Sequence, residues 1–164
     1  DLGIYELDIP ILGICYGAQL IAQQLGGTVS QFEAGEYGRT TLHFSGGNLL
    51  AGQPTEQDVW MSHFDCITEA PVGFTVTAST KNAPAAAFEN DRIFAVQYHP
   101  EVSHTPYGQQ TIERWLDLAG IVRDVMGGVV DLGGERAAFE REVLDQLALF
   151  VGVLGAAVHG HDRV

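Results

Sequence analysis

Basic side chains, cysteines and long apolar runs are all scarce in this chain. Lysine and arginine together number 8 against 21 aspartates and glutamates, which gives a formal net charge of −13. A surface this negative repels a phosphate backbone, so we expect no nucleic-acid partner. The two cysteines cannot build a disulfide framework, which favours a reducing compartment such as the cytoplasm. No apolar run reaches the roughly 18 residues that a membrane-spanning helix needs, so none is predicted.

What is present fits a globular domain with a substantial core. The chain has 164 residues, 46% of them hydrophobic, and this length suits one domain better than two. It begins with Asp1, and apolar residues lead directly into the first predicted strand, so we expect the natural N-terminus to lie further upstream. Glycine pairs and then a helical apolar period over residues 135–154 mark a change of character near the C-terminus. The sequence therefore predicts a main domain over residues 1–119 and an atypical, helical tail over residues 120–164.

The order of the predicted elements indicates an α/β fold. Residues 9–14 form a short apolar run typical of a strand buried on both faces, and a helix over residues 16–25 follows, ended by Gly26 and Gly27. A second helix is predicted over residues 109–118. Turn residues separate β-rich segments at residues 28–32, 39–44, 59–61, 75–78, 85–88 and 93–97. This order predicts an α/β sheet with an antiparallel extension.

A cysteine lies where the first predicted strand meets the first predicted helix. Gly13, Cys15 and Gly17 follow the Gly-x-nucleophile-x-Gly pattern, in which the glycines allow a tight turn and a close approach of backbones. A helix N-terminus favours the thiolate, and the backbone N–H of Tyr16 would point toward a developing oxyanion. The alternative for Cys15 is a buried structural role. Cys66 has no glycine neighbours, and we expect it to be structural.

A histidine and a glutamate follow the last predicted strand. In an extended chain, residues i and i+2 face the same way, so His99 and Glu101 can both turn toward one site, and Pro100 stiffens the segment between them. A catalytic imidazole needs a carboxylate or carbonyl on its second nitrogen to fix its tautomer and orientation. A surface turn is the alternative for this tripeptide taken alone. Together with Cys15, the pattern predicts a nucleophile, a base and an acidic third member.

At these residues the chain resembles the class I (triad-type) glutamine amidotransferases. Residues 10–19 (Pro-Ile-Leu-Gly-Ile-Cys-Tyr-Gly-Ala-Gln) and 96–101 (Val-Gln-Tyr-His-Pro-Glu) carry the resemblance. Within the family, residues 36–39, 59–65, 102–110 and 112–116 resemble the amidotransferase domain of GMP synthetases. The resemblance covers residues 1–120. It implies a flavodoxin-like three-layer sheet with an antiparallel extension, whose first strands would lie upstream of Asp1.

The resemblance also implies a role for each matching residue. Cys15 would attack the side-chain amide of glutamine, release ammonia and leave a γ-glutamyl thioester. His99 would take the thiol proton and then donate to the departing amine, and Glu101 would orient His99. Substrate binding is implied for the backbone amide of Tyr16, the side chain of Gln19 and the backbone near Ser62, Phe64 and Asp65. Helix-face solvation and strand-end capping are the alternatives for Gln19 and Ser62.

Ammonia made by this family is passed to an acceptor site, which implies that the partner is a synthetase domain or subunit. For the GMP synthetase type, that partner would aminate XMP to GMP and would hold ATP and magnesium. Residues 1–119 carry 14 acidic and 4 basic side chains and no phosphate-binding loop, so we expect neither cofactor nor metal in this segment. His63 and His104 are interpreted as interface or solvated residues.

Some features depart from the family pattern, and several functions stay open. Phe64 stands where the family has glycine, and the Gly-Gly-Pro loop that gives a second oxyanion donor would lie upstream. Because loss of such a donor lowers rates about 10²–10³-fold, the chain alone is predicted to be weakly active or unstable. The alternatives are an amidotransferase for another acceptor, a cysteine hydrolase of γ-glutamyl amides, and a non-catalytic module on the same fold.

Overall fold

A computed structural model describes residues 2–31 and 34–121, which belong to one compact unit, Asp1–Val122. The elements are, in chain order, η1 (Leu2–Tyr5), β1 (Ile11–Ile14), α1 (Tyr16–Gln24), β2 (Thr28–Ser30), β3 (Glu36–Phe44), β4 (Glu56–His63), β5 (Cys66–Glu69), β6 (Thr75–Ser79), β7 (Ala87–Glu89), β8 (Ile93–Val96) and α2 (Gly108–Leu118). The predicted helices and strands within this range are confirmed, with boundaries within three residues. The helix predicted over residues 135–154 lies outside the described residues.

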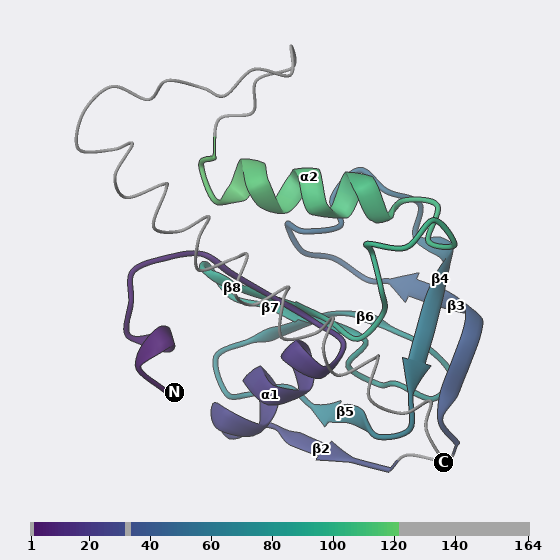
Figure 1. Ribbon diagram of the computed structural model, residues 1–164, viewed down its shortest axis with the longest axis horizontal. Helices are drawn as coiled ribbons and strands as arrows, with labels where there is room; N and C mark the ends of the chain where they lie inside the picture. The colour runs from purple at the N-terminus through teal and green to yellow at the C-terminus, as the bar shows by residue number, and fades with distance from the viewer. Residues whose placement is uncertain (1, 32–33, 122–164) are drawn as a thin grey trace, which may run out of the picture. The chain divides into compact units, whose positions relative to one another are not determined.

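The central sheet combines one parallel pair with an antiparallel extension. Its order is β1-β8-β7-β6-β3-β4, and only β1 and β8 run parallel among these neighbours. β2 and β5 form a separate antiparallel pair, which lies beside α1 (Figure 1). In the parallel pair, Ile14 is level with Val96, so the segments that follow β1 and β8 leave the same edge of the sheet. The predicted α/β sheet with an antiparallel extension is therefore confirmed.

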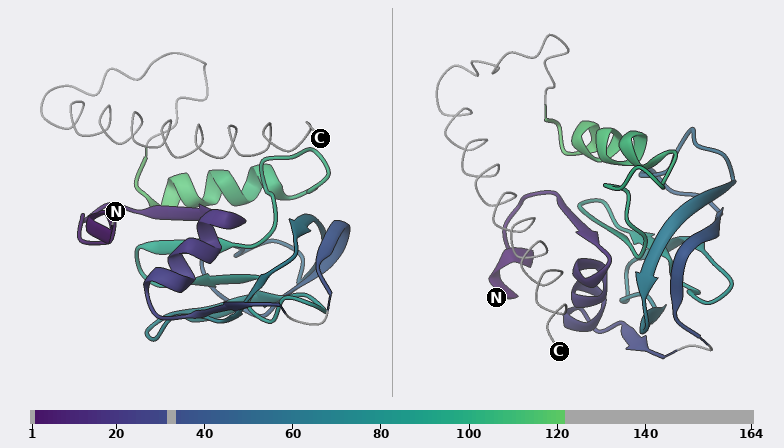
Figure 2. Two further views of the ribbon diagram at one scale, coloured as in Figure 1. Left: turned by 60° about the horizontal axis from the view of Figure 1, so that its bottom comes forward. Right: turned by 45° about the vertical axis from the view of Figure 1, so that its right-hand side comes forward.

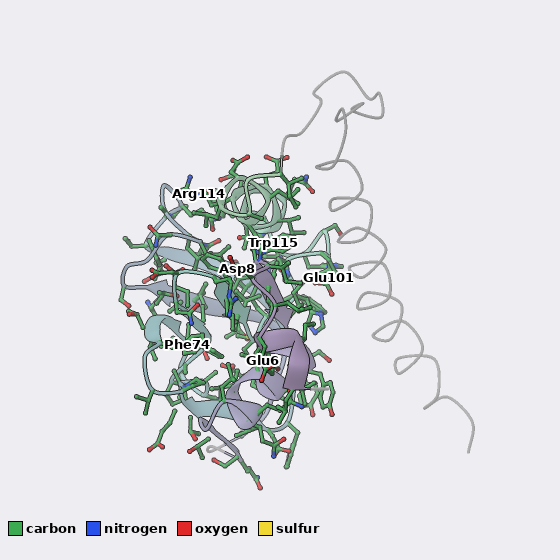
Figure 3. The ribbon with its side chains drawn as sticks, turned by 90° about the vertical axis from the view of Figure 1, so that its left-hand side faces the viewer. Glu6, Asp8, Phe74, Glu101, Arg114 and Trp115 are labelled. Carbon is green, nitrogen blue, oxygen red and sulfur yellow. The ribbon has the colours of Figure 1, made fainter. Side chains whose placement is uncertain are left out.

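The two helices cover opposite faces of the part of the sheet that contains β1, β8 and β7 (Figures 1 and 2). On α1, the buried residues Ala18, Ile21 and Ala22 share one face, and they pack with apolar side chains of β1, β5, β7 and β8. On α2, Thr111 and Trp115 are one turn apart and both buried, and Trp115 points from the helix toward the sheet (Figure 3). The arrangement is the three-layer sheet that the family resemblance implies.

Glycine makes possible the tight connection between β1 and α1. A Cβ added at Gly13 would lie 2.5 Å from Cδ1 of Ile21 and 3.0 Å from the backbone nitrogen of Ala18. Any side chain at Gly13 would therefore push the first turn of α1 away from the strand. The glycine thus sets where the helix begins, and with it the position of Cys15.

No helix among the described residues combines the length and the apolar character needed to cross a membrane.

Candidate functional site

Cys15 occupies the single residue between β1 and α1. Its φ of 50° and ψ of −107° make it the one non-glycine residue with positive φ in the described part of the chain. Such a backbone costs on the order of 1–3 kcal/mol and persists only where the surroundings impose it. Two hydrogen bonds hold it: the Cys15 N–H donates to the Val96 carbonyl (2.8 Å), and the Cys15 carbonyl accepts from Gln19 N–H (3.1 Å).

The same position places the cysteine at the positive end of a helix. Cys15 is the N-cap of α1, and no side chain caps the helix there. The first N–H groups of a helix have no partner inside it, and the Tyr16 N–H is the first of these. The side chain of Tyr16 is 64% exposed, while Cys15 is 8% exposed. The turn therefore presents a sulfur and free backbone donors in one place, as an anion-stabilising site requires.

His99 and Glu101 lie just beyond the C-terminal end of β8, the parallel neighbour of β1. Nδ1 of His99 lies 2.7 Å from Oε1 of Glu101. Two backbone contacts fix the histidine: its N–H donates to the Trp60 carbonyl (2.9 Å), and its carbonyl accepts from the Thr105 hydroxyl (2.6 Å). That hydroxyl also accepts from the Trp60 N–H (3.1 Å). The imidazole is thus held by its backbone and by a carboxylate on one ring nitrogen.

The other ring nitrogen of His99 faces the nucleophile candidate. Nε2 is buried and has no hydrogen bond of ordinary geometry among the described residues. Interaction with the Cys15 side chain is nevertheless the largest influence on the ring, and with the Glu101 hydrogen bond it outweighs burial and raises the pKa of His99 to about 10. Cys15 therefore adjoins Nε2 without an aligned hydrogen bond, as is common in active sites without a ligand. At neutral pH the ring is an imidazolium.

Glu101 responds to the same contact. Burial pushes the pKa of Glu101 upward, but the hydrogen bond and the charge of His99 outweigh burial and bring it below its ordinary value. The carboxylate is therefore ionised at neutral pH and stabilises the protonated ring. Its side chain remains 47% exposed, against 19% for His99, and it lies at the edge of the molecule in Figure 3. Solvent thus reaches the carboxylate of the pair more than the imidazole.

Backbone carbonyls at the end of β4 and in its connection to β5 reach the cysteine and the helix that follows it. The Cys15 thiol donates to the Ser62 carbonyl (3.7 Å), and Nε2 of Gln19 donates to the Asp65 carbonyl (2.6 Å). Phe64, between them, is 55% exposed. The structure thus brings Ser62, Asp65 and Gln19 beside Cys15. Residues 62–65, which are the last two residues of β4 and the two-residue connection to β5, are named the β4–β5 loop below.

Several residues at this site had no role in the sequence-based interpretation. Gln97 is fully buried, and its amide lies between Cys15 and Gln19. Thr105 clamps the backbone of His99 as described above. A buried glutamine and a threonine in a turn carry no pattern that distinguishes these roles.

Within residues 2–31 and 34–121, no group of three or more His, Cys, Asp or Glu side chains is placed to hold a metal ion.

The interpretation of His63 as an interface or solvated residue is wrong. Its side chain is 2% exposed, and its Nε2 lies 3.1 Å from Oε2 of Glu36, which is level with it across β3 and β4. The strand alternation buries His63 because Val59 and Met61 face the same way. His104 is exposed and packs against the Trp60 ring, with centroids 4.5 Å apart. Cys66 is buried, as predicted for a structural thiol.

Sequence comparisons relate the chain to amidotransferases. The family model "Glutamine amidotransferase class-I" matches residues 2–118. The chain is 54% identical over 127 residues to a GMP synthase [glutamine-hydrolyzing] from Mycobacterium leprae, covering 76% of this chain and 24% of that protein. It is 57% identical over 161 residues to a protein of the same name from Streptomyces avermitilis, covering 94% of this chain and 30% of that protein. The chain thus spans about a quarter to a third of the length of these relatives.

Solved structures show the same likeness. A protein from Thermoplasma acidophilum, described as a candidate subunit of GMP synthase, aligns with a TM-score of 0.68 at 37% identity, covering 71% of this chain and 60% of that one. A glutamine amidotransferase from Thermotoga maritima aligns with a TM-score of 0.56 at 26% identity, covering 70% of this chain and 48% of that one. Because the family model matches more than half of the sequence, this chain belongs to the class-I glutamine amidotransferase family.

Proposed function

We propose that the chain hydrolyses L-glutamine to glutamate and ammonia through a thioester on Cys15. One observation carries the proposal: a cysteine on a strained turn at the start of α1 adjoins an imidazole that a carboxylate holds from the other side. The two halves come from neighbouring parallel strands, β1 and β8. A nucleophile, a proton carrier and an orienting carboxylate are the groups that amide cleavage requires.

In the first half of the reaction, Cys15 acts as a thiolate whose proton is held on Nε2 of His99, and its Sγ attacks the side-chain carbonyl carbon of glutamine. A C–S bond forms, and negative charge develops on the carbonyl oxygen, where the Tyr16 N–H can donate. The C–N bond then breaks, and the leaving nitrogen takes a proton from Nε2 of His99, so ammonia departs. A pKa of about 10 keeps His99 protonated at neutral pH, which is the form that this step uses.

In the second half, a water molecule attacks the thioester. His99, deprotonated by the first half, accepts a proton from that water, and the C–S bond breaks to give glutamate and the Cys15 thiolate beside the imidazolium of His99. Glu101 stabilises the imidazolium each time it forms, through the 2.7 Å contact at Nδ1. Each group thus ends the cycle in the state in which it began.

Binding of the substrate's amino-acid end falls to Gln19 and the β4–β5 loop. The Gln19 side chain makes two contacts through Nε2, which donates to the Asp65 carbonyl and to Oε1 of Gln97. This orientation leaves Oε1 of Gln19 as the acceptor for an ammonium group. The carbonyls of residues 62–65 offer further acceptors for the same group, whereas exposed Phe64 supplies apolar contact. These acceptors suit the α-ammonium group of a free amino acid.

The ammonia is proposed to pass to a synthetase domain or subunit that aminates XMP to GMP. The names that the relatives carry and the share of their length that this chain leaves uncovered support this partner. ATP and magnesium would act in that partner. The free thiols Cys15 and Cys66 are in keeping with a cytoplasmic location.

The direct test measures glutamate and ammonia released from L-glutamine by the full chain. Equal amounts of both are expected, with no release by Cys15→Ala and unchanged release by Cys66→Ala, which serves as the matched control. Addition of a GMP synthetase subunit with XMP and ATP is expected to raise turnover. Release that persists in Cys15→Ala would overturn the nucleophile, and turnover indifferent to the synthetase and XMP would overturn the acceptor.

A further inference from the structure

Gln97 is a fully buried polar residue at the end of β8, directly before the segment that carries His99. Its exposed fraction is 0%, and its backbone N–H donates to the Ala86 carbonyl (2.8 Å). A primary amide taken out of water must find partners for its N–H groups and its oxygen, because an unsatisfied group costs on the order of 1–3 kcal/mol. The side-chain amide of Gln97 must therefore find its hydrogen-bond partners among the residues that surround it.

Those partners are the two residues of the site that lie one helical turn apart. Oε1 of Gln97 accepts from Nε2 of Gln19 (3.2 Å), and Nε2 of Gln97 points at Sγ of Cys15 (3.8 Å), within the reach of a hydrogen bond to sulfur. The reverse orientation of the amide would place Nε2 against the Nε2 donor of Gln19. Because Gln19 also donates to the Asp65 carbonyl, its own orientation is set independently. The side-chain N–H group of Gln97 thus faces the sulfur of Cys15.

We propose that Gln97 is a catalytic residue whose carboxamide donates a hydrogen bond to the Cys15 sulfur. A donor in this position favours the ionised sulfur over the thiol, since hydrogen bonds to a charged partner are the stronger ones. The same carboxamide ties the sulfur to Gln19, so that the attacking atom and the substrate-binding side chain keep a fixed separation. The inference rests on the proposed role of Cys15 as nucleophile.

A purely structural role for Gln97 makes a different prediction. A buried amide that only fills space and satisfies Gln19 can be replaced by another residue of its size without altering how readily the sulfur ionises. Gln57 is a suitable comparison, because it is also buried and its Nε2 donates to Oε1 of Gln53 (2.9 Å), away from the cysteine. Gln57→Met is therefore the matched control for Gln97→Met.

The experiment follows alkylation of Cys15 by iodoacetamide as a function of pH in the full chain, with each cysteine read separately by mass spectrometry. In Gln97→Met the pH at half-maximal rate is expected to rise by about one unit, which is about a tenfold slower alkylation on the acid side of the transition. Gln57→Met is expected to match the unmodified chain. An unchanged midpoint in Gln97→Met, with the variant folded by circular dichroism, overturns the proposal.

A second variant keeps the test decisive where Gln97→Met does not fold. Gln97→Glu retains the size and the acceptor for Gln19 but turns a carboxylate toward the sulfur, so the midpoint is expected to rise further; no rise overturns the proposal. In the unmodified chain, the NMR signals of the Gln97 side-chain amide are expected to shift as Cys15 ionises with rising pH. Signals that do not change would contradict the contact. Failure of the proposed function looks different: Cys15 would then react no faster than buried Cys66.

Discussion

The described residues contain three glutamate–histidine pairs, and the two shorter ones differ in burial and in what lies beside the histidine. In the pair Glu101–His99 the two side chains are 47% and 19% exposed, and the imidazole adjoins Cys15. In the pair Glu36–His63 they are 5% and 2% exposed. Each histidine also has a second ring nitrogen that is buried without a hydrogen bond of ordinary geometry among the described residues.

The buried pair is surrounded by groups that fix it. The Thr80 hydroxyl donates to the carboxylate of Glu36 at 2.8 and 2.9 Å to its two oxygens, and it accepts from the Ala83 N–H. Burial raises the pKa of Glu36, but hydrogen bonds from His63 and Thr80 outweigh burial and lower it overall. His63 is the last residue of β4 and lies within the β4–β5 loop, so the buried pair anchors this loop.

Under the proposed function, the same chemical pair serves two purposes in this unit. A histidine that must exchange protons with a substrate needs a ring nitrogen at a reactive atom and some access to solvent, which His99 has. A histidine that anchors a loop needs neither, and burial with a carboxylate makes it sensitive to loss of its partner. Position in the sequence does not separate the two cases, because His63 ends β4 and His99 lies just beyond the end of β8.

The largest expected effect is on activity, and it comes from replacing each of the two histidines separately. His99→Gln is expected to lower glutamine hydrolysis by at least about 10³-fold, because the proton carrier is lost. His63→Gln keeps an N–H donor for Glu36, and activity is expected to stay within about tenfold. Steady-state assays of both folded variants provide the comparison. Equal losses in the two variants would erase the proposed division of roles.

The next largest effect is on the free energy of unfolding. Here the buried pair Glu36–His63 is expected to matter more than the pair Glu101–His99. Glu36→Leu leaves His63 and Thr80 buried without their partner, so the free energy of unfolding is expected to fall by about 3–5 kcal/mol. Glu101→Leu, at a half-exposed position, is expected to lower it by about 1 kcal/mol or less. Urea denaturation at pH 7 measures both. A smaller loss for Glu36→Leu than for Glu101→Leu would contradict the anchoring role.

The dependence of stability on pH sharpens the comparison further. A pKa of about 10 in the folded chain, above the ordinary value of 6.5, means that the folded form holds the His99 proton more tightly than the unfolded form. Its stabilisation is therefore complete below pH 6.5 and is lost as the pH rises through 10. Urea denaturation at pH 6 and pH 10 is expected to show a smaller difference in His99→Gln than in the unmodified chain. Identical differences would argue against the raised pKa.

The smallest expected effect concerns the clamp on the backbone of His99. Thr105→Val removes the hydroxyl that bridges the His99 carbonyl and the Trp60 N–H, at a cost of about 1 kcal/mol for the lost contact. We expect about a tenfold lower kcat with little change in KM, since the substrate-binding residues are untouched. Thr105→Ser keeps the hydroxyl and is expected to restore kcat. A change confined to KM would place Thr105 elsewhere in the mechanism.

Much of the fold near the site follows from local sequence. The apolar run of residues 9–14, its glycine and the helix that follows predict β1, the turn and α1, because steric and packing rules act there over a few residues. The order of strands in the sheet does not follow in this way. The pairing of β1 with β8 joins segments about eighty residues apart, and only the folded chain reveals it.

The candidate site divides along the same line. Cys15, His99 and Glu101 stand in recognisable local patterns, and the structure brings them together. The burial of His63 depends on its register with Glu36 across β3 and β4, and no short motif encodes that register. The contact between Gln97 and Cys15 depends on the parallel pairing of β1 and β8. Long-range pairing, which single-sequence patterns do not report, therefore accounts for both.

Cys15 is proposed to be a nucleophile made reactive by the His99–Glu101 pair. The most direct measurement is labelling of the full chain by a glutamine-analogue electrophile, followed by mass spectrometry of the peptides that contain Cys15 and Cys66. We predict modification of Cys15 alone, suppressed by L-glutamine and at least about 10²-fold slower in His99→Gln. Equal modification of both cysteines, or labelling of Cys15 that is indifferent to His99→Gln, would contradict this claim.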